Sequence, residues 1–138
     1  MSIVQNITTS YKAEVLQGIH DAADTYKIAL YTNAAILGAS TTAYTTTNEV
    51  VGIGYTAGGA TLSGFNVTTS GTTAILDFND PFWENATITA RGALIYNSSK
   101  SNKAVYVLDF GSDITSTNGT FAITLPTPDA ANGLIRIG

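Results

Sequence analysis

The stretch "ATITARGALIYNSSKSNKAVYVLDF", residues 86–110, holds two runs rich in apolar and β-branched residues on either side of a polar segment. Runs of this length that are bounded by turn-forming residues are typical of β-strands. We therefore predict strands over residues 86–96 and 103–110, with a turn over residues 97–102. A chain that repeats this pattern belongs to the mainly-β class.

The pattern does repeat along the chain. The stretch "TYKIALYT", residues 25–32, alternates Tyr26, Ile28 and Leu30 with other side chains, and this period of two predicts a strand. Four more runs are separated by segments rich in Gly, Pro, Asn, Asp, Ser and Thr. They predict strands at 60–67, 72–78, 120–126 and 134–137, with turns at 68–71, 79–85, 111–119 and 127–133.

One helix is predicted before these strands. The stretch "SYKAEVLQGIHDAAD" begins at Ser10, a plausible N-cap, and indicates a helix over residues 11–23. Its interior Gly18 costs about 1 kcal/mol relative to Ala, so the helix should depend on docking against a sheet. The apolar stripe that would dock comprises Val15, Leu16, Ile19, Ala22 and Ala23.

Together these elements predict one domain over residues 1–138. We expect an antiparallel β-sandwich or jelly roll of about seven to eight strands with one N-terminal α-helix. Residues 33–48 show no sustained period and are predicted to form a long loop, which in a compact domain is often functional. Residues 1–10 are predicted to form an extended arm that orders on assembly.

Composition limits the function. Six Lys and Arg against ten Asp and Glu give a net charge of −4, and charged residues are only 12% of the chain. Scattered cations disfavour nucleic-acid binding, which needs a basic patch. The chain has no cysteine, so thiolate chemistry is excluded. No apolar run approaches about 18 residues and no signal-peptide pattern opens the chain, so we expect neither membrane insertion nor secretion.

The glycine-rich stretch "VVGIGYTAGGATLSGFNV", residues 50–67, has a spacing close to that of a dinucleotide-binding loop. A phosphate-binding loop needs a helix directly after it, and here strand-like sequence follows. We therefore interpret these glycines as places where the backbone bends, bulges or takes a positive φ.

Candidate catalytic groups are few, and we predict that the chain is not an enzyme and has no cofactor. His20 is the only histidine, and on the predicted helix it would make a local contact with Asp24. Two acidic clusters have oxygen ligands suited to a hard cation, and whether calcium binds there stays open. They are Asp77 with Asp80 and Glu84, and Asp109 with Asp113.

A surface rich in Thr, Ser and Asn and poor in charge is readily buried against a partner, although Thr also simply suits a sheet. The long loop contributes Ile36, Leu37 and Tyr44 as candidate partner contacts. Phe82 and Trp83 in "NDPFWEN" are candidates as well, or else one ring closes the end of the sandwich, and we favour closure.

Three stretches, "HDAADTYKIALYT", "TTNEVVGIGYTAGGATL" and "ITARGALIYN", resemble a family of small virion proteins of tailed bacteriophages. The resemblance spans nearly the whole chain, and the bulky "PFW" departs from it. It implies a structural role without enzymatic activity, as a cement or decoration protein on the capsid exterior. The implied partners are the major capsid protein and copies of the chain itself, as a dimer or trimer.

Two alternatives remain open at this level. A tail or neck component would use a similar small sandwich with long loops. A carbohydrate-binding module would use Trp83, Phe82 and the tyrosines as platforms for sugar rings.

Overall fold

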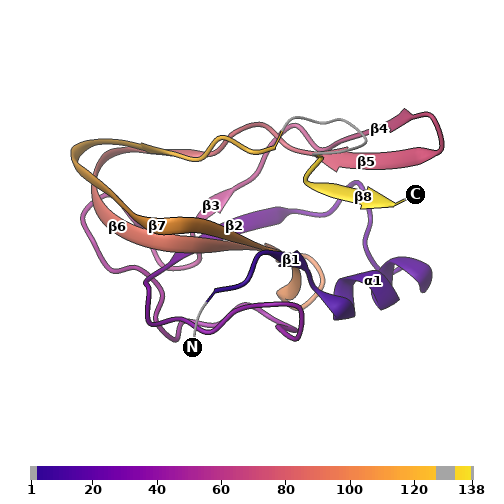
Figure 1. Ribbon diagram of the computed structural model, residues 1–138, viewed down its shortest axis with the longest axis horizontal. Coiled ribbons are helices and arrows are strands. Elements are labelled where there is room, and N and C mark those ends of the chain that lie inside the picture. The colour runs from indigo at the N-terminus through magenta and orange to yellow at the C-terminus, as the bar shows by residue number, and fades with distance from the viewer. Residues whose placement is uncertain (1–2, 127–132, 138) are drawn as a thin grey trace.

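The computed structural model describes residues 3–126 and 133–137 and shows a β-sandwich of two antiparallel sheets. Its elements are β1 (Asn6–Ile7), α1 (Thr9–Leu16), β2 (Tyr26–Tyr31), β3 (Ala60–Thr61), β4 (Asn66–Ser70), β5 (Thr73–Asp77), β6 (Phe82–Asn97), β7 (Lys103–Ala122) and β8 (Ile135–Ile137). One sheet has the order β1-β7-β6-β2-β3 and the other β4-β5-β8. Figure 1 shows them as two layers, which confirms the predicted fold class.

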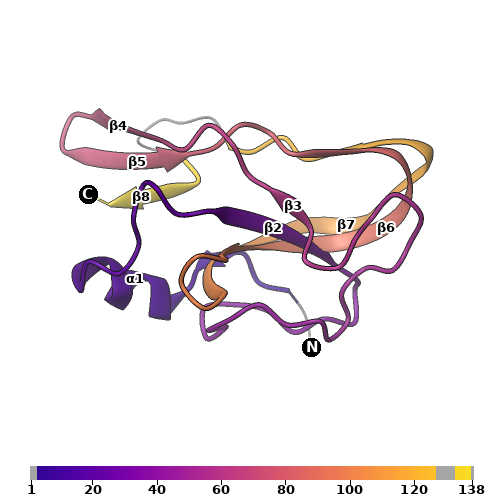
Figure 2. The ribbon, with the colours of Figure 1, turned by 180° about the vertical axis from the view of Figure 1, so that it is seen from behind.

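The β6–β7 hairpin is the largest part of the structure. Its two long strands pair from Phe82 opposite Ala122 down to Asn97 opposite Lys103, with register shifts at four places. Such irregularities bend a ladder and increase its twist. Figures 1 and 2 show the hairpin curving at one end of the molecule, so that its far half rises into the layer of the three-stranded sheet. Trp83 and Phe121 from that half join the core between the layers.

The five-stranded sheet is buried on both faces. Along β2, Ile28 and Leu30 belong to the core between the two layers, whereas Ala29 and Tyr31 belong to a second cluster on the opposite face. Alternation along a strand produces this division. The second cluster includes Leu37, so the long connection after β2 covers the outer face of the sheet. This connection runs along the bottom of Figure 1.

The prediction for the helix is wrong at both ends. The helix in the structure begins earlier, at Thr9. Thr8, not Ser10, is the N-cap, and its hydroxyl accepts a hydrogen bond of 3.2 Å from the Tyr11 N–H. An N-cap side chain satisfies one of the free N–H groups at the start of a helix. The helix docks through Tyr11, which is buried, and Val15, which is partly buried.

The helix also ends seven residues earlier than residue 23, because Gly18 terminates it. Gly18 has φ +73°, its N–H bonds to the Val15 carbonyl at 3.1 Å, and the Ile19 N–H bonds to the Glu14 carbonyl at 3.0 Å. These two bonds form a Schellman motif, for which glycine is the preferred residue. Leu16, part of the predicted stripe, is therefore exposed at the last helical position.

Several strand boundaries also differ from the predictions. The predicted turn at 111–119 lies inside β7, and β6 begins at Phe82 within the predicted turn at 79–85. Most of β7 from Gly111 to Thr120 is exposed, and the Thr89 and Thr115 hydroxyls lie 3.1 Å apart across β6 and β7, so polarity there marks an exposed ladder. The predicted strand at 60–67 is interrupted between β3 and β4, and the predicted turn at 68–71 is largely strand.

The C-terminal and N-terminal predictions have mixed outcomes. Residues 120–126 contribute only their first three residues to a strand, and the predicted turn at 127–133 lies mostly outside the described residues. Ile3 is buried and β1 pairs with β7, so residues 3–8 lie against the sheet and do not form a free arm. The long loop over residues 33–48 is confirmed, with isolated bridges but no strand.

The glycines after this loop behave as interpreted, since β3 and not a helix follows them. Gly59 has φ +80°, and a Cβ there would overlap the backbone carbonyl of Ile28 in the neighbouring strand. Only glycine allows the chain to approach β2 this closely. Gly71 has φ +59° with open space around it.

We predict that Gly59→Ala lowers the free energy of unfolding by more than about 2 kcal/mol, because conformational strain adds to a clash with backbone. Gly71→Ala is the matched control and should cost only about 1 kcal/mol, the conformational part alone. Urea unfolding of both variants measures the difference. Equal losses would mean that the close approach at Gly59 is unimportant.

Candidate functional site

The Glu49 carboxylate lies at the centre of a hydrogen-bonded cluster in the connection between β2 and β3. It is buried, and it accepts hydrogen bonds from the Tyr44 hydroxyl at 2.6 Å, the Gly58 N–H at 2.8 Å and the Tyr55 hydroxyl. A buried charge is tolerated only when such donors replace its water. The cluster therefore satisfies the charge with donors that all come from residues 44–58.

The same cluster fastens the long connection to the sheet. The Tyr55 hydroxyl accepts a hydrogen bond of 2.9 Å from the Leu30 N–H, and the Tyr96 hydroxyl donates one of 2.6 Å to the Gly58 carbonyl. Tyr44 also stacks on Tyr96, with ring centroids 4.7 Å apart. Burial, with the bond to Glu49 second, raises the pKa of both Tyr55 and Tyr44 well above the usual value. These hydroxyls therefore remain protonated donors.

Two β-branched side chains between Glu49 and Tyr55 are held outward. Val51 is 97% exposed and Ile53 is 72% exposed. The glycines between and after them, Gly52 and Gly54, lie against the backbone of β6, where a Cβ would clash. The ladder contact is fixed by the Thr87 N–H, which donates to the Ile53 carbonyl at 2.9 Å. Because the glycines face the sheet, the alternating Val51 and Ile53 must face solvent.

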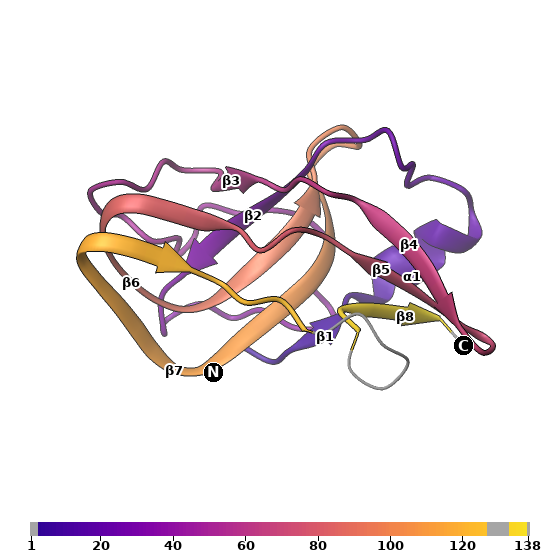
Figure 3. The same ribbon diagram turned by 90° about the horizontal axis from the view of Figure 1, so that it is seen from above.

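Val51 and Ile53 belong to a longer run that carries no charge. Residues 50–76, which we call the uncharged run, contain no Asp, Glu, Lys, Arg or His. The run includes β3 and β4, which are edge strands of the two sheets. Figure 3 shows that β3 and β4 follow one another along the same side of the sandwich. The uncharged run therefore combines exposed apolar side chains with two sheet edges.

Val51 and Ile53 were not among the contacts predicted from the sequence. From the sequence we interpret the glycines of "VVGIGYTAGG" as places where the backbone bends, and this interpretation assigns no role to Val51 and Ile53. The alternation of glycine with β-branched residues was the available signal, since glycines that face a sheet turn the intervening side chains to solvent. Glu49 had no comparable signal, because its partners Tyr44, Tyr55 and Gly58 follow no recognised spacing.

Of the predicted contacts in the long loop, only one faces outward. Ile36 is 64% exposed, whereas Leu37 is 4% exposed and packs against the outer face of the sheet. The prediction of Leu37 as a partner contact is therefore wrong, because the alternation of side chains turns Leu37 toward Ile3 and the sheet. Tyr44 is half-buried and its hydroxyl is taken by Glu49, so it supports the loop and offers a partner only part of its ring.

The aromatic pair of "NDPFWEN" divides in the same way. Trp83 is 7% exposed and packs between Tyr55 and Phe121, with ring centroids 6.1 and 6.0 Å away. It closes the core, as favoured above, and as a partner contact it is wrong. Phe82 is 57% exposed at the start of β6. It borders a small concavity of about 120 Å³ beside β3, so it lies next to the uncharged run.

His20 lies beyond the helix, and its predicted contact with Asp24 is replaced by others. Its Nε2 lies 2.8 Å from a Glu14 carboxylate oxygen, and its Nδ1 lies 3.0 Å from the Asn97 amide nitrogen. The Asn97 amide also donates to Asp24 at 2.8 Å, and Lys100 pairs with Asp24 at 2.7 Å. The network joins the segment after α1 to the turn between β6 and β7, which is a structural use of the histidine.

Two of the residues in the acidic clusters bond to other parts of the chain. Asp80 accepts a hydrogen bond of 2.8 Å from the Leu125 N–H, and Asp109 accepts from the Gly111 N–H and pairs with Arg91. One oxygen of Asp77 is buried without a partner among residues 3–126 and 133–137. No grouping of three metal-ligating side chains occurs within those same ranges. No helix in the described part of the chain is long and apolar enough to span a bilayer.

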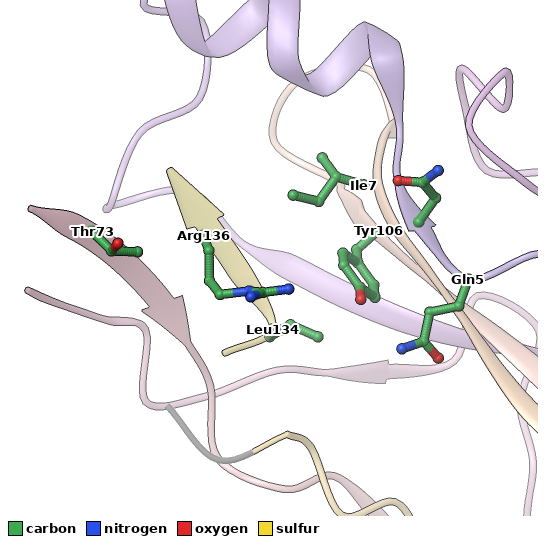
Figure 4. Close-up of a pocket in the computed structure, with 7 residues that line it drawn as sticks. Gln5, Ile7, Thr73, Tyr106, Leu134 and Arg136 are labelled. Atoms are coloured by element: carbon green, nitrogen blue, oxygen red, sulfur yellow. The ribbon is translucent and has the colours of Figure 1, made fainter. Parts of the chain in front are cut away.

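A concavity of about 530 Å³ opens between the two layers beside β1 and β8. Figure 4 shows Thr73, Arg136 and Leu134 on one side and Ile7, Tyr106 and Gln5 on the other. The Gln5 side chain already accepts a hydrogen bond from the Asp109 N–H, and Arg136 also has an interaction partner. The polar groups of this opening are therefore partly used within the chain.

Comparison with protein-family models, curated proteins and solved structures finds no match for this chain. A function must therefore be proposed from its own residues and from the resemblance of its motifs.

We predict that Tyr55→Phe lowers the free energy of unfolding by about 1–3 kcal/mol, because it leaves the Leu30 N–H without a partner and removes one of the three donors to Glu49. Glu49→Gln should cost a similar amount, since the neutral amide is a weaker acceptor for three donors. Glu84→Gln, at an exposed position, is the matched control. Urea unfolding that shows no difference from this control would contradict the role of the cluster.

We predict a loss of stability in acid that depends on Asp24. Burial alone would raise the pKa of Asp24, but bonds to Asn97 and Lys100 outweigh it and hold the pKa below its usual value. The folded state thus favours the ionised form, so this stability is present above the ordinary pKa and disappears as the pH falls through the lowered one.

Urea unfolding followed from about pH 6 to about pH 3 measures this loss. Asp24→Asn should be less stable near neutrality and should lose less than the parent chain over that interval. Asp113→Asn, at an exposed position, should follow the parent chain throughout. A parallel decline for all three proteins would exclude Asp24 as the source.

Proposed function

We propose that this chain is a structural protein of a tailed-phage virion that decorates and cements the outer surface of the major capsid protein shell. The observation that carries the proposal is the uncharged run, which presents Val51 and Ile53 to solvent from a stretch of chain without charged residues. A protein that works by covering a surface needs such exposed apolar side chains.

The energetics suit this role. Burying one Val or Ile side chain is worth about 1.5–3 kcal/mol. No charge in residues 50–76 has to be stripped of water, so the desolvation cost that accompanies buried ions does not arise there. A modest contact of this kind becomes effective when a shell repeats it, because neighbouring sites raise the effective concentration.

The contact is also prepared before binding. Glu49 fixes the chain immediately ahead of Val51, and the hydrogen bond from Thr87 fixes Ile53. A side chain that is already held in place loses little conformational freedom on binding. β-Branched residues add to this effect, because they have few rotamers.

The resemblance of three stretches to virion proteins of tailed phages supports the same class. This resemblance does not distinguish a shell protein from a tail or neck protein, but the number of copies per particle does. A shell protein is present in hundreds of copies, whereas a neck or tail ring holds a few to a few dozen. The carbohydrate-binding alternative loses its main platform, because Trp83 is inside the core.

We predict that phage particles lacking this protein lose their genome at a lower temperature than complete particles. Adding the purified chain back should restore heat resistance. The chain carrying both Val51→Asp and Ile53→Asp should not restore it, because two charges would have to be buried against the shell. Genome release on heating, followed with a DNA-binding dye, measures the effect.

The control is Leu16→Asp, which places the same charge at an exposed apolar position on α1, outside the uncharged run. This variant should restore heat resistance as the parent chain does. The proposal fails if particles without the protein are as stable as complete ones, or if electron microscopy of the particle finds the chain only in the tail. Equal activity of the two Asp variants would exclude the uncharged run as the contact.

A further inference from the structure

Strand β4 is an open and unguarded sheet edge. All five of its residues, Asn66–Ser70, are exposed, and in the described part of the chain β5 is its only partner. Natural proteins protect such edges with lysine, proline, a bulge or a covering segment. Strand β4 has no charge and no proline, and its pairing with β5 runs without a bulge.

The hairpin geometry shows which backbone groups are free. Ser70 pairs with Thr73 across a two-residue turn, and the pair that flanks such a turn exchanges both backbone hydrogen bonds. Because bonded pairs alternate, Thr68 and Ser70 direct their N–H and C=O groups toward β5. Val67 and Thr69 therefore direct theirs away from the sheet.

These free groups are self-complementary. In an antiparallel pair, two residues that exchange both hydrogen bonds stand opposite each other, with a non-bonded pair between successive bonded pairs. Two copies of β4 related by a two-fold axis at Thr68 would place Val67 opposite the Thr69 of the second copy, and Thr69 opposite its Val67. Every outward N–H and C=O of these residues then finds a partner.

We propose that the chain pairs with a second copy of itself through antiparallel contact of the two β4 strands, with Thr68 at the two-fold axis. The product is a continuous six-stranded sheet in the order β8-β5-β4-β4-β5-β8. Figure 3 shows β4 at the outer side of its sheet, opposite β8.

Charge does not oppose a second copy as the occupant of this edge. Each chain carries a net charge of −4, which disfavours contact through charged surfaces, but β4 has no charged residue, so pairing of the two strands places no like charges opposite each other. Cross-strand pairs of Thr with Thr and of Val with Thr are also well suited to a sheet.

Pairing would also extend the apolar inner face of the small sheet. Val67 stands opposite Leu76, which stands opposite Ile135, so the three side chains share one face. Leu76 and Ile135 are buried in the core, whereas Val67 at the end of this row is largely exposed. A second β4 strand would cover Val67.

A contact of five residues per strand buries far less than the roughly 1,200–2,000 Å² of a stable interface. The dimer is accordingly weak in solution and gains strength where copies are held close together. The pairing is a property of the isolated chain, so it stands or falls independently of the capsid proposal.

The experiment uses the absence of cysteine from the chain. Thr68→Cys introduces one thiol at the proposed axis, where a non-bonded antiparallel pair has Cα atoms about 4.5 Å apart, inside the disulfide range of about 4.4–6.8 Å. Thr47→Cys places the thiol at an exposed loop position as the matched control. Both purified variants are oxidised at equal concentration, and the covalent dimer is followed on a non-reducing gel.

We expect T68C to form the covalent dimer at least about tenfold faster than T47C, because pairing raises the effective concentration of its thiols. Adding Thr69→Lys to T68C should slow the reaction severalfold, since it places two like charges beside the axis. Adding Thr47→Lys to T68C should not slow it. An added lysine reduces the net negative charge of each chain and so weakens the repulsion between two copies. If the thiols met only by random collision, both lysine variants would therefore form the covalent dimer faster.

Equal rates for T68C and T47C would overturn the proposal, and so would faster dimer formation with Thr69→Lys. Unfolding of the reduced variants in urea checks that each is folded. All of the changed positions are exposed, so the variants should retain the stability of the parent chain.

Discussion

A single buried carboxylate holds the later part of the long connection between β2 and β3 in place. Glu49 accepts hydrogen bonds from Tyr44, Tyr55 and Gly58, and Tyr55 in turn binds the backbone of β2. Apolar packing of Leu37 and backbone bonds such as that from the Ala104 N–H to the Thr42 carbonyl hold the earlier part of the connection on the outer face of the sheet. The clamp at Glu49 fixes its later part and with it the outward presentation of Val51.

The uncharged run shows how stability and association are separated in this chain. Its glycines approach the sheet closely and serve the fold, whereas the β-branched residues between them face outward and contribute little to it. Strand β4 likewise completes its sheet on one side and leaves the other side open. A free monomer would gain from charged guards at such an edge. Their absence leaves this edge free for the pairing of two β4 strands that we propose.

Much of the fold could be predicted from the sequence because the strands are strongly patterned. The β2 alternation and the runs at 86–96 and 103–110 predicted strands correctly. The helix end was misread because Gly18 has the same identity inside a helix and at its C′ position, and only its φ distinguishes the two. The polar half of β7 resembled a turn because both of its faces are largely exposed. For the candidate site, the outward Ile36 and Phe82 were found, but Glu49 depends on tertiary contacts that no local spacing encodes.

The curved β6–β7 hairpin has a thermodynamic consequence for the molecule as a whole. Its near half forms the centre of one sheet, and its far half packs Trp83 and Phe121 into the interior under the other. Neither layer is therefore an autonomous unit, since both lose support when this one pair of strands separates. Thermal unfolding should therefore be a single cooperative transition without a partly unfolded intermediate. A particle coated with the protein would lose this coat over a narrow range of temperature.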